Sequence, residues 1–401
     1  MKVLQINTSI NSSAPGRIAS EIGDFLINMG HESFVGYGRI CRKNESSPIK
    51  IGNKKDLLFH LITSRLLDIH GFSSKKATEA FVDNVKEINP DIIHLHNLHG
   101  YYIHIGVLFK YLKKAGKPVV WTFHDCWPFT GHCCYFDRVN CFKWQTECFD
   151  CPNTYGYPRS WVVDYSRENY RQKKVLFTGL ENLVIVSPSE WLAGHLRNSF
   201  LSGYEIRVIN NGIDLDKFRP VDSEAIRAMY NLNKKYILGV ASIWTERKGL
   251  EDFKRLRKIL DPEIEIVLVG LTRSQIKSLH VGMKGISRTE SIDKLAALYS
   301  GAKAFINPTY IDNFPSVNIE ALASGTPVIT YNTGGSTEAI DIKTGRGVEK
   351  GNIRELHSSI MAVINTNDLY NTAQCCERAV RKFSAQERFG EYLNLYQELL
   401  T

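Results

Sequence analysis

Short runs of Val, Ile and Leu alternate with helical stretches along most of this 401-residue chain, and this alternation limits the folds open to it. Several of the runs are almost continuously apolar, as expected for parallel strands buried on both faces. The sequence therefore predicts an α/β fold. In the first half the expected strands are residues 3–9, 33–38, 91–97, 118–125, 183–187 and 207–210, and the expected helices are 16–29, 57–68, 76–88, 103–114, 165–177 and 190–198.

The same alternation restarts after an interruption rich in Asn, Gly and Pro at residues 210–220. One core rarely serves more than about 250–300 residues, so we predict two domains. We expect two Rossmann-like domains, residues 1–212 and 213–382, facing across a deep cleft, and a C-terminal helix (383–401) that packs back on the first. In the second half the expected strands are 236–242, 265–270, 302–307 and 327–331, with helices near 250–259, 292–299 and 315–323 and a helical tail after Ile353.

Composition excludes several classes of protein. Hydrophobic residues at 43% and charged residues at 23% are ordinary values for a globular chain. No run approaches the roughly 20 apolar residues of a membrane-spanning helix, and the N-terminus does not resemble a secretory signal, so we expect a cytoplasmic protein. The net charge of +8 is modest, and Lys and Arg form no stripe with aromatic residues, which argues against a nucleic-acid binder.

The most informative segment runs from Ile306 to Gly335. An expected strand ends at Asn307, Asp312 lies in the following loop, and Glu320 follows eight residues later in a helix that begins near Pro315 or Ser316. Free N–H groups at a helix start bind anions, and an ionised carboxylate accepts two hydrogen bonds from neighbouring sugar hydroxyls. The pattern suits a ligand with phosphates and a sugar, although an ordinary acidic loop before a helix remains the alternative.

This segment resembles the E-x7-E region of retaining GT-B glycosyltransferases of family 4, with Asp312 in place of the first Glu. The stretches ALASGTPVIT and NTGGSTEAI that follow are similar to the same family. The resemblance implies a GT-B fold in which Glu320 binds the ribose of a sugar nucleotide. It also implies that Asp312 holds the transferred sugar and the diphosphate together with the backbone of Phe314, Pro315, Ser316 and Val317.

A second motif, GVASIWTERKGLEDF, places Arg247 and Lys248 directly before an expected helix. Two cations at a helix start suit a diphosphate whose negative charge grows as a glycosidic bond breaks. A solvated pair on a turn is the alternative. The family carries a further Arg where Ser242 or Ile243 stands here, so we expect Arg247 to take that role beside Lys248.

In the first domain, TFHDC places His124 at the carboxyl end of a strand, where it resembles the family's active-site histidine that contacts the donor sugar. A structural histidine is the alternative. The stretch NTSINSSAPGR resembles the family's glycine-containing loop near donor and acceptor, with Gly16 at a helix start. It lacks G-x-G-x-x-G, which argues against a nicotinamide dehydrogenase. His94 and His96 share a strand face, and we interpret them as polar strand ends rather than a metal pair.

Six of the nine cysteines fall between residues 126 and 151, in an expected insertion over 126–157. Cys148 and Cys151 have the spacing of a zinc knuckle, and Cys133 and Cys141 could complete a structural four-thiolate zinc site. Reduced cysteines packed against aromatic residues are the alternative. The insertion, with HDCWPFTGHC, resembles a bacterial subgroup linked to exopolysaccharide and colanic-acid synthesis.

The resemblance implies a glycosyltransferase that moves a sugar from a UDP- or GDP-sugar to a glycan or lipid-linked acceptor in surface polysaccharide biosynthesis. His124, Lys248, Asp312 and Glu320 would be its catalytic residues, with no cofactor besides the donor. The rivals are a sugar-nucleotide 2-epimerase, a glycosyl phosphorylase and a non-catalytic binding protein of the same fold. Peripheral contact with an anionic membrane, or else a solvated helix face, would explain the lysines at 110, 113, 114 and 117.

Overall fold

The computed structural model describes residues 1–366 and 369–401 and divides the chain into two compact units. The first unit comprises Met1–Asn210 and Phe389–Thr401, and the second comprises Asn211–Arg388. The sequence-based boundaries lay after residues 212 and 382. The second boundary falls later because the last helix, α14 (Ala385–Leu400), begins in one unit and continues into the other.

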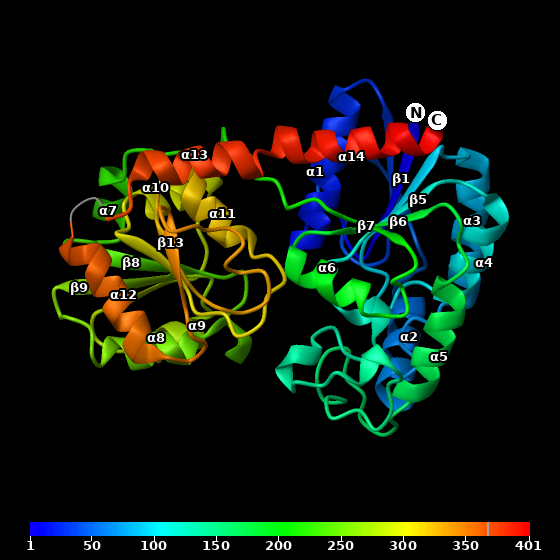
Figure 1. Ribbon diagram of the computed structural model, residues 1–401, viewed down its shortest axis with the longest axis horizontal. Coiled ribbons are helices and arrows are strands. Elements are labelled where there is room, and N and C mark those ends of the chain that lie inside the picture. Colours follow the sequence, from blue (N-terminus) through cyan, green and yellow to red (C-terminus); the bar gives the residue numbers. More distant parts are fainter. Residues whose placement is uncertain (367–368) are drawn as a thin grey trace. The chain divides into compact units, whose positions relative to one another are not determined.

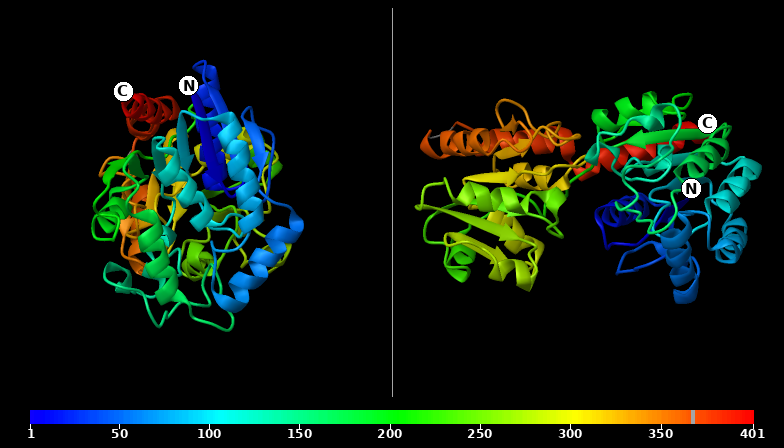
Figure 2. Two further views of the ribbon diagram at one scale, coloured as in Figure 1. Left: turned by 90° about the vertical axis from the view of Figure 1, so that its right-hand side faces the viewer. Right: turned by 90° about the horizontal axis from the view of Figure 1, so that it is seen from below.

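The first unit is built on a seven-stranded parallel sheet with helices on both faces (Figures 1 and 2). Its central strands are buried along their whole length, whereas the edge strands are partly exposed, which follows the continuous apolar runs of the sequence. The strand order is β3-β2-β1-β4-β5-β6-β7, with bounds β1 Lys2–Asn7, β2 Glu32–Tyr37, β3 Ser47–Lys50, β4 Ile92–Leu95, β5 Val119–Thr122, β6 Leu183–Ser187 and β7 Glu205–Val208.

Four helices of the first unit, α1, α2, α4 and α6, begin at side-chain caps. Ser13 accepts a hydrogen bond from the Gly16 N–H at the start of α1, and Asn53 and Asp56 form a capping box at the start of α2. The helices within Met1–Asn210 are α1 Ala14–Asn28, α2 Lys54–Leu67, α3 Lys75–Ile88, α4 Ile105–Ala115, α5 Ser166–Phe177 and α6 Glu190–Arg197.

Helix α14 completes the core of the first unit with two buried tyrosines. The Tyr396 hydroxyl lies 2.6 Å from Nδ1 of His94 in β4, and the Tyr392 hydroxyl lies 3.1 Å from Oγ1 of Thr122 in β5. The other ring nitrogen of His94 lies 2.8 Å from the same threonine oxygen. His94 therefore ties the last helix to the sheet.

The segment between β5 and α5 is irregular, as the sequence predicted. It contains three short 3-10 turns, Trp127–Phe129, Phe136–Arg138 and Lys143–Gln145, around buried aromatic side chains. Lys173 of α5 reaches into this segment and donates hydrogen bonds to the carbonyl oxygens of Trp127 (2.9 Å) and Thr130 (3.1 Å). The insertion is thus anchored on α5 from within.

The second unit repeats the architecture with a six-stranded parallel sheet of order β10-β9-β8-β11-β12-β13. Its strands are β8 Lys235–Val240, β9 Ile264–Val269, β10 Met283–Ile286, β11 Ala304–Asn307, β12 Val328–Tyr331 and β13 Gly345–Val348. Its helices are α7 Glu224–Met229, α8 Leu250–Arg257, α9 Arg273–Lys277, α10 Ile292–Ser300, α11 Ser316–Ala323, α12 Ile353–Asn365 and α13 Thr372–Phe383.

The two sheets confirm the predicted α/β class, and the predicted buried strands and long helices are all present. The sequence did not predict β3, β10, β13, α7 or α9, which are short and lie largely at sheet edges or between longer elements. Within the two described stretches of chain, we find no helix with the length and apolar character needed to cross a membrane.

Candidate active site

Three of the predicted donor-site residues meet in the second unit. A 3-10 turn, η4 (Glu246–Lys248), lies between β8 and α8, and its Lys248 Nζ forms an ion pair with Oδ2 of Asp312, which lies in the loop after β11. Nη1 of Arg247 lies 3.9 Å from the same oxygen and donates a hydrogen bond of 2.8 Å to the carbonyl oxygen of Ile311. Two cations therefore face one carboxylate.

Backbone packing fixes this cluster of η4 and the Asp312 loop. The Tyr310 N–H donates to the Arg247 carbonyl oxygen at 2.8 Å. Gly249 has φ of +76°, and a Cβ there would lie 2.2 Å from the carbonyl oxygen of Pro308. Gly334, with φ of +53°, approaches Asp312 so closely that a Cβ would lie 1.7 Å from its carbonyl oxygen. Glycine is the residue that fits both positions.

The helix that follows Asp312 begins at Ser316, with Pro315 as the residue before its first turn and no side-chain cap. The N–H groups of Ser316 and Val317 have no acceptor inside the helix, as in any first turn, so they can bind an anion. Of the four positions from Phe314 to Val317 that were predicted to bind the donor through the backbone, Pro315 has no N–H group and cannot donate a hydrogen bond. The carbonyl oxygen of Phe314 accepts a hydrogen bond from Asn211 at 3.3 Å.

Glu320 lies in the same helix but is directed into protein. Its side chain is 3% exposed, and its Oε2 accepts a hydrogen bond of 3.0 Å from the hydroxyl of Tyr299 in α10. Tyr299 is itself fully buried against Phe218 and Phe305. The carboxylate therefore links α10 and α11, and any ligand that uses it must share it with Tyr299.

In the first unit, His124 follows β5 and heads a chain of polar side chains. Its Nε2 lies 3.1 Å from Nδ1 of His96, whose Nε2 lies 2.9 Å from Oε1 of Gln5. Burial lowers the pKa of His124 to about 4, with Asp125 opposing and His99 adding to the shift. The imidazole is therefore neutral at pH 7 and can exchange hydrogen bonds with a sugar hydroxyl.

A second pair next to His124 was not predicted. Nε2 of His99 lies 2.6 Å from Oδ2 of Asp125, and Oδ1 of that carboxylate accepts the Trp127 N–H at 2.9 Å. Burial raises the pKa of Asp125, but His99 and the Trp127 N–H outweigh it and bring the pKa below its usual value. The positions of His99 and Asp125 in the sequence could have indicated this pair. Each residue follows a buried strand of the same sheet, and neighbouring parallel strands end at the same edge.

Gly16 lies in the first turn of α1, and its N–H is used by the Ser13 side chain at 3.2 Å. A Cβ on Gly16 would lie 2.8 Å from the carbonyl oxygen of Ser9, so the glycine allows the loop after β1 to fold tightly onto the helix. The structure thus gives Gly16 a packing role in this loop. A direct contact of Gly16 with the donor stays a prediction.

The four predicted zinc ligands gather in the insertion. Cys133, Cys141, Cys148 and Cys151 all line one small cavity of about 20 Å³, and all are free thiols. The Gly131 N–H donates to the sulfur of Cys148 at 3.2 Å. In the described chain, the groups of three ligand atoms within 4.8 Å of one another are Asp68, His70 and His132, and His99, Asp125 and Cys134. The four sulfurs are thus spaced more widely than in a loaded zinc site.

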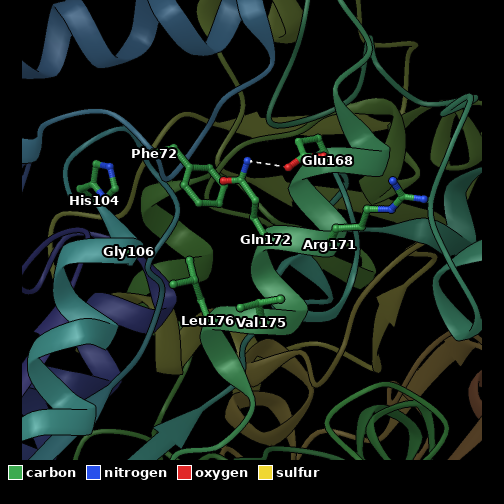
Figure 3. A pocket seen from close by; sticks show the side chains of 8 residues that line it. All are labelled: Phe72, His104, Gly106, Glu168, Arg171, Gln172, Val175 and Leu176. Carbon is green, nitrogen blue, oxygen red and sulfur yellow. Dashed lines mark hydrogen bonds between the residues drawn. The ribbon is translucent and has the colours of Figure 1, made fainter.

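A separate pocket of about 370 Å³ opens in the first unit beside α4 and α5 (Figure 3). Its walls include the apolar side chains of Phe72, Val175 and Leu176, and Figure 3 shows Gln172 bonded to Glu168 at its rim. His104, also at the wall, already accepts the Val107 N–H. The pocket contains none of the predicted site residues, and its polar groups do not converge on one point.

Comparison with known sequences identifies both units. Residues 16–217 match the family described as Glycosyltransferase Family 4, and residues 234–366 match Glycosyl transferases group 1. The chain is 26% identical over its whole length to the whole of the colanic acid biosynthesis glycosyl transferase WcaC of Escherichia coli (strain K12).

Two further relatives match part of the chain. The capsular polysaccharide biosynthesis glycosyltransferase CapM of Staphylococcus aureus is 25% identical, over 48% of this chain and 54% of CapM. The N,N'-diacetylbacillosaminyl-diphospho-undecaprenol alpha-1,3-N-acetylgalactosaminyltransferase of Campylobacter jejuni is 25% identical, over 57% of this chain and 63% of that enzyme.

Solved structures show the same fold. Sucrose-phosphate synthase of Thermosynechococcus elongatus aligns with a TM-score of 0.73 and 18% identity, over 100% of this chain and 99% of the other. Anabaena HepE in complex with UDP aligns with a TM-score of 0.69 and 15% identity, over 99% and 100%. The fold is GT-B, as predicted. With the family match spanning half of its residues, the chain belongs to glycosyltransferase family 4 and is a glycosyltransferase.

Proposed function

We propose that this glycosyltransferase moves a sugar, with retention of configuration, from a nucleoside-diphosphate donor to a glycan or lipid-linked acceptor in surface polysaccharide biosynthesis. The observation that carries the proposal is that Arg247 and Lys248 meet Asp312, which lies four residues before the uncapped start of α11 at Ser316. The colanic acid, capsular and undecaprenol-linked activities named for the relatives support the acceptor class. UDP bound to a structural neighbour supports the donor class.

In the second unit, Lys248 and Arg247 would bind the diphosphate together with the N–H groups of Ser316 and Val317. The donor phosphates would compete with Asp312 for Lys248 and free the carboxylate to accept hydrogen bonds from the transferred sugar. Glu320 would accept a hydrogen bond from a ribose hydroxyl while keeping Tyr299 as its second partner. The cations interact most strongly with the transition state, in which the leaving diphosphate gains negative charge. Interactions that are stronger in the transition state than in the bound substrate are the ones that accelerate a reaction.

In the first unit, neutral His124 would hydrogen-bond the transferred sugar, and His96 and Gln5 would orient its ring. The acceptor hydroxyl would attack the anomeric carbon on the face from which the diphosphate departs. The bond between that carbon and the phosphate oxygen breaks, and the departing phosphate takes the acceptor proton. The route assigns no protein side chain as nucleophile, and Arg247, Lys248 and the α11 N–H groups carry the charge stabilisation.

The test combines binding and turnover. Thermal shift with UDP, GDP and ADP and their sugars should show stabilisation by one base, because a ligand stabilises the state that binds it. With radiolabelled donor, Lys248→Ala and Glu320→Ala should each lower kcat/KM for donor hydrolysis at least tenfold. Lys258→Ala, an exposed lysine at the end of α8, should leave it unchanged.

The same assay separates the rival functions. A 2-epimerase would convert the donor sugar without any acceptor, and a phosphorylase would require inorganic phosphate. A binding protein would be stabilised by a nucleotide but would show no turnover. Full activity in both Lys248→Ala and Glu320→Ala would refute the proposed donor site.

The acceptor class also bears on location. We propose that the enzyme acts at the cytoplasmic face of an anionic membrane. The lysines at positions 110, 113 and 114 of α4 are exposed, while Leu108, Phe109 and Leu112 of the same helix are buried in the core. This basic face could approach lipid headgroups, but it offers no apolar side chain for insertion.

We further propose that Cys133, Cys141, Cys148 and Cys151 hold a structural zinc ion. Support comes from the common cavity of about 20 Å³ that the four side chains line, which has room for one small occupant. Four thiolates would close the coordination sphere of zinc, so the ion would stabilise the insertion and take no part in the transfer. Zinc would have to draw the sulfurs inward, to bonds of about 2.3 Å.

A further inference from the structure

Helix α2 buries polar side chains and exposes apolar ones. Its buried side chains are polar, His60 and Ser64. His60 bonds through both ring nitrogens, to the Ser74 hydroxyl at 2.9 Å and to the Gly71 N–H at 3.1 Å. Folding alone favours apolar residues inside, so the pattern requires another explanation.

The outward side of α2 is apolar instead. Large hydrophobic side chains with exposed fractions between 41% and 61% lie on it: Leu58, Phe59, Ile62, Leu66 and Leu67. At about 100° per residue, four of the five fall within about 100° of the helix circumference and form one stripe, with Leu67 beside it. Scattered exposed hydrophobic residues are normal in proteins, but a contiguous stripe of this size marks an interaction site.

The insertion extends the stripe. The Trp161 N–H donates a hydrogen bond of 2.7 Å to the carbonyl oxygen of Arg65 in α2, and the Arg65 guanidinium lies 5.6 Å from the centre of the Trp161 ring. Trp161 is 65% exposed and its neighbour Val162 is 75% exposed. We name these two residues and the five of α2 the α2 surface. Helix α2 itself lies at the edge of the first unit (Figures 1 and 2).

The exposed charges that helix α2 itself contributes are positive. Lys54 and Lys55 open the helix and are exposed, and Arg65 lies in line with the apolar stripe. The one acidic residue of the helix, Asp56, is used in the capping box, where it accepts the Asn53 N–H at 2.8 Å. Apolar side chains with a tryptophan at their border and flanking cations match an anionic lipid interface.

We propose that the α2 surface docks the enzyme on an anionic lipid bilayer, with the apolar side chains inserted among the lipids and Lys54, Lys55 and Arg65 on the phosphates. The inference rests on the proposed lipid-linked acceptor, which would be held in that bilayer. A second copy of the chain is the poorer occupant, because a twofold contact would bring the same cations together from both copies.

The full chain is tested by sedimentation with vesicles of phosphatidylcholine alone and of phosphatidylcholine with phosphatidylglycerol. We expect binding to the anionic vesicles that weakens with salt. The double substitution Phe59→Ser/Ile62→Ser should weaken it more than tenfold, because the free energy of insertion scales with buried apolar area. Lys54→Glu/Lys55→Glu should also weaken binding and reduce its salt dependence.

The matched control is Val281→Ser/Ile342→Ser, which removes two side chains of the second unit that are 99% and 91% exposed and should leave vesicle binding unchanged. Equal binding by all variants, or no binding of the unaltered chain, would overturn the proposal. So would a change of oligomeric state on substitution, since the surface would then cover a second copy. Nucleotide-induced thermal shift and donor hydrolysis in solution should persist in Phe59→Ser/Ile62→Ser. These two measurements test the proposed donor site, whereas vesicle binding tests the α2 surface, so a failure of one proposal can be distinguished from a failure of the other.

Discussion

The hydroxyl of Tyr299 donates a hydrogen bond of 3.0 Å to the Glu320 carboxylate, between two adjacent helices of the second unit. The contact assigns Glu320 a structural partner in addition to its proposed ribose. The two roles can be separated because Gln and Glu both accept a bond from Tyr299, whereas only Glu is an anion.

Glu320→Gln should lower the affinity for the nucleoside diphosphate that stabilises the protein about tenfold or more with little loss of stability, since a hydrogen bond to a charged group is worth about 1.5–3 kcal/mol. Tyr299→Phe should instead lower the free energy of unfolding by about 1–2 kcal/mol and change affinity little. Calorimetric titration and urea unfolding give the two quantities. If Tyr299→Phe and Glu320→Gln reduce stability alike and neither alters affinity, Glu320 is structural only.

Gly334→Ala should disturb the Asp312 loop, although Gly334 lies in a different loop, after β12. Its φ of +53° is unfavourable for alanine, and the new Cβ would overlap the Asp312 carbonyl oxygen. We expect a loss of about 1–3 kcal/mol in unfolding free energy and weaker nucleotide binding. Gly194→Ala in α6, where no atom lies within 4 Å of the new Cβ, is the control and should be neutral or stabilising. Unchanged nucleotide affinity in Gly334→Ala would separate this loop from the donor site.

The buried histidines of the first unit predict sensitivity to acid. Burial lowers the pKa of His94 to about 3 and that of His124 to about 4. Between these values and about 6.5 the unfolded chain binds more protons than the folded chain, so the unfolding free energy falls as the pH drops through this window. Each fully shifted histidine contributes about 1.4 kcal/mol per pH unit.

Urea unfolding at pH 7.5 and pH 5 checks this sign. His94→Gln should reduce the slope, whereas His280→Gln, an exposed position in the second unit, should not. A stability that is flat between the two pH values would contradict the assignment. Because His124 stays neutral down to about pH 4, its titration should not contribute to the pH dependence of kcat/KM near pH 6.5. Any step near pH 6.5 should therefore persist in His124→Asn.

Zinc in the insertion is open to direct measurement. We expect about one zinc ion per chain by mass spectrometry of the purified protein, because four thiolates complete its preferred coordination. The double substitution Cys148→Ser/Cys151→Ser should abolish zinc binding and lower the melting temperature. Cys41→Ser, at an exposed thiol, should keep the zinc ion and the unaltered melting temperature. Burial raises the pKa of Cys148 to about 11 and that of Cys151 to about 12, so zinc retention should weaken in acid as protons compete for the sulfurs. Zinc-free protein with the unaltered melting temperature would leave the cysteines as packing residues.

The buried strands and amphipathic helices were predictable because both sheet faces are covered, which forces long apolar runs into the sequence. The strand Leu183–Ser187 was predicted to the residue. The edge strands SPIK, MKGI and GRGV were not, because they are partly exposed and pair on one side, so they carry little apolar signal.

The candidate site was predicted in part. The motifs that contain Lys248 and Asp312 were each predicted to bind the donor, and the structure brings the two side chains together. The pair of His99 and Asp125 was missed, since the contact joins the segments that follow two strands, β4 and β5, which are neighbours in the sheet but distant in the sequence. The inverted polarity of α2 was missed as well, because a helical pattern of apolar residues does not reveal which face the protein covers.

Helix α14 makes the folding of the N-terminal sheet depend on the C-terminal end of the chain. Tyr392 and Tyr396 fill the interior against Thr122 and His94, so the sheet that begins with residue 2 lacks part of its core until residues near 396 have been made. During synthesis the second unit is therefore complete before the first can close. A stop codon that removes only the last dozen residues should leave an open first unit that chaperones and proteases recognise.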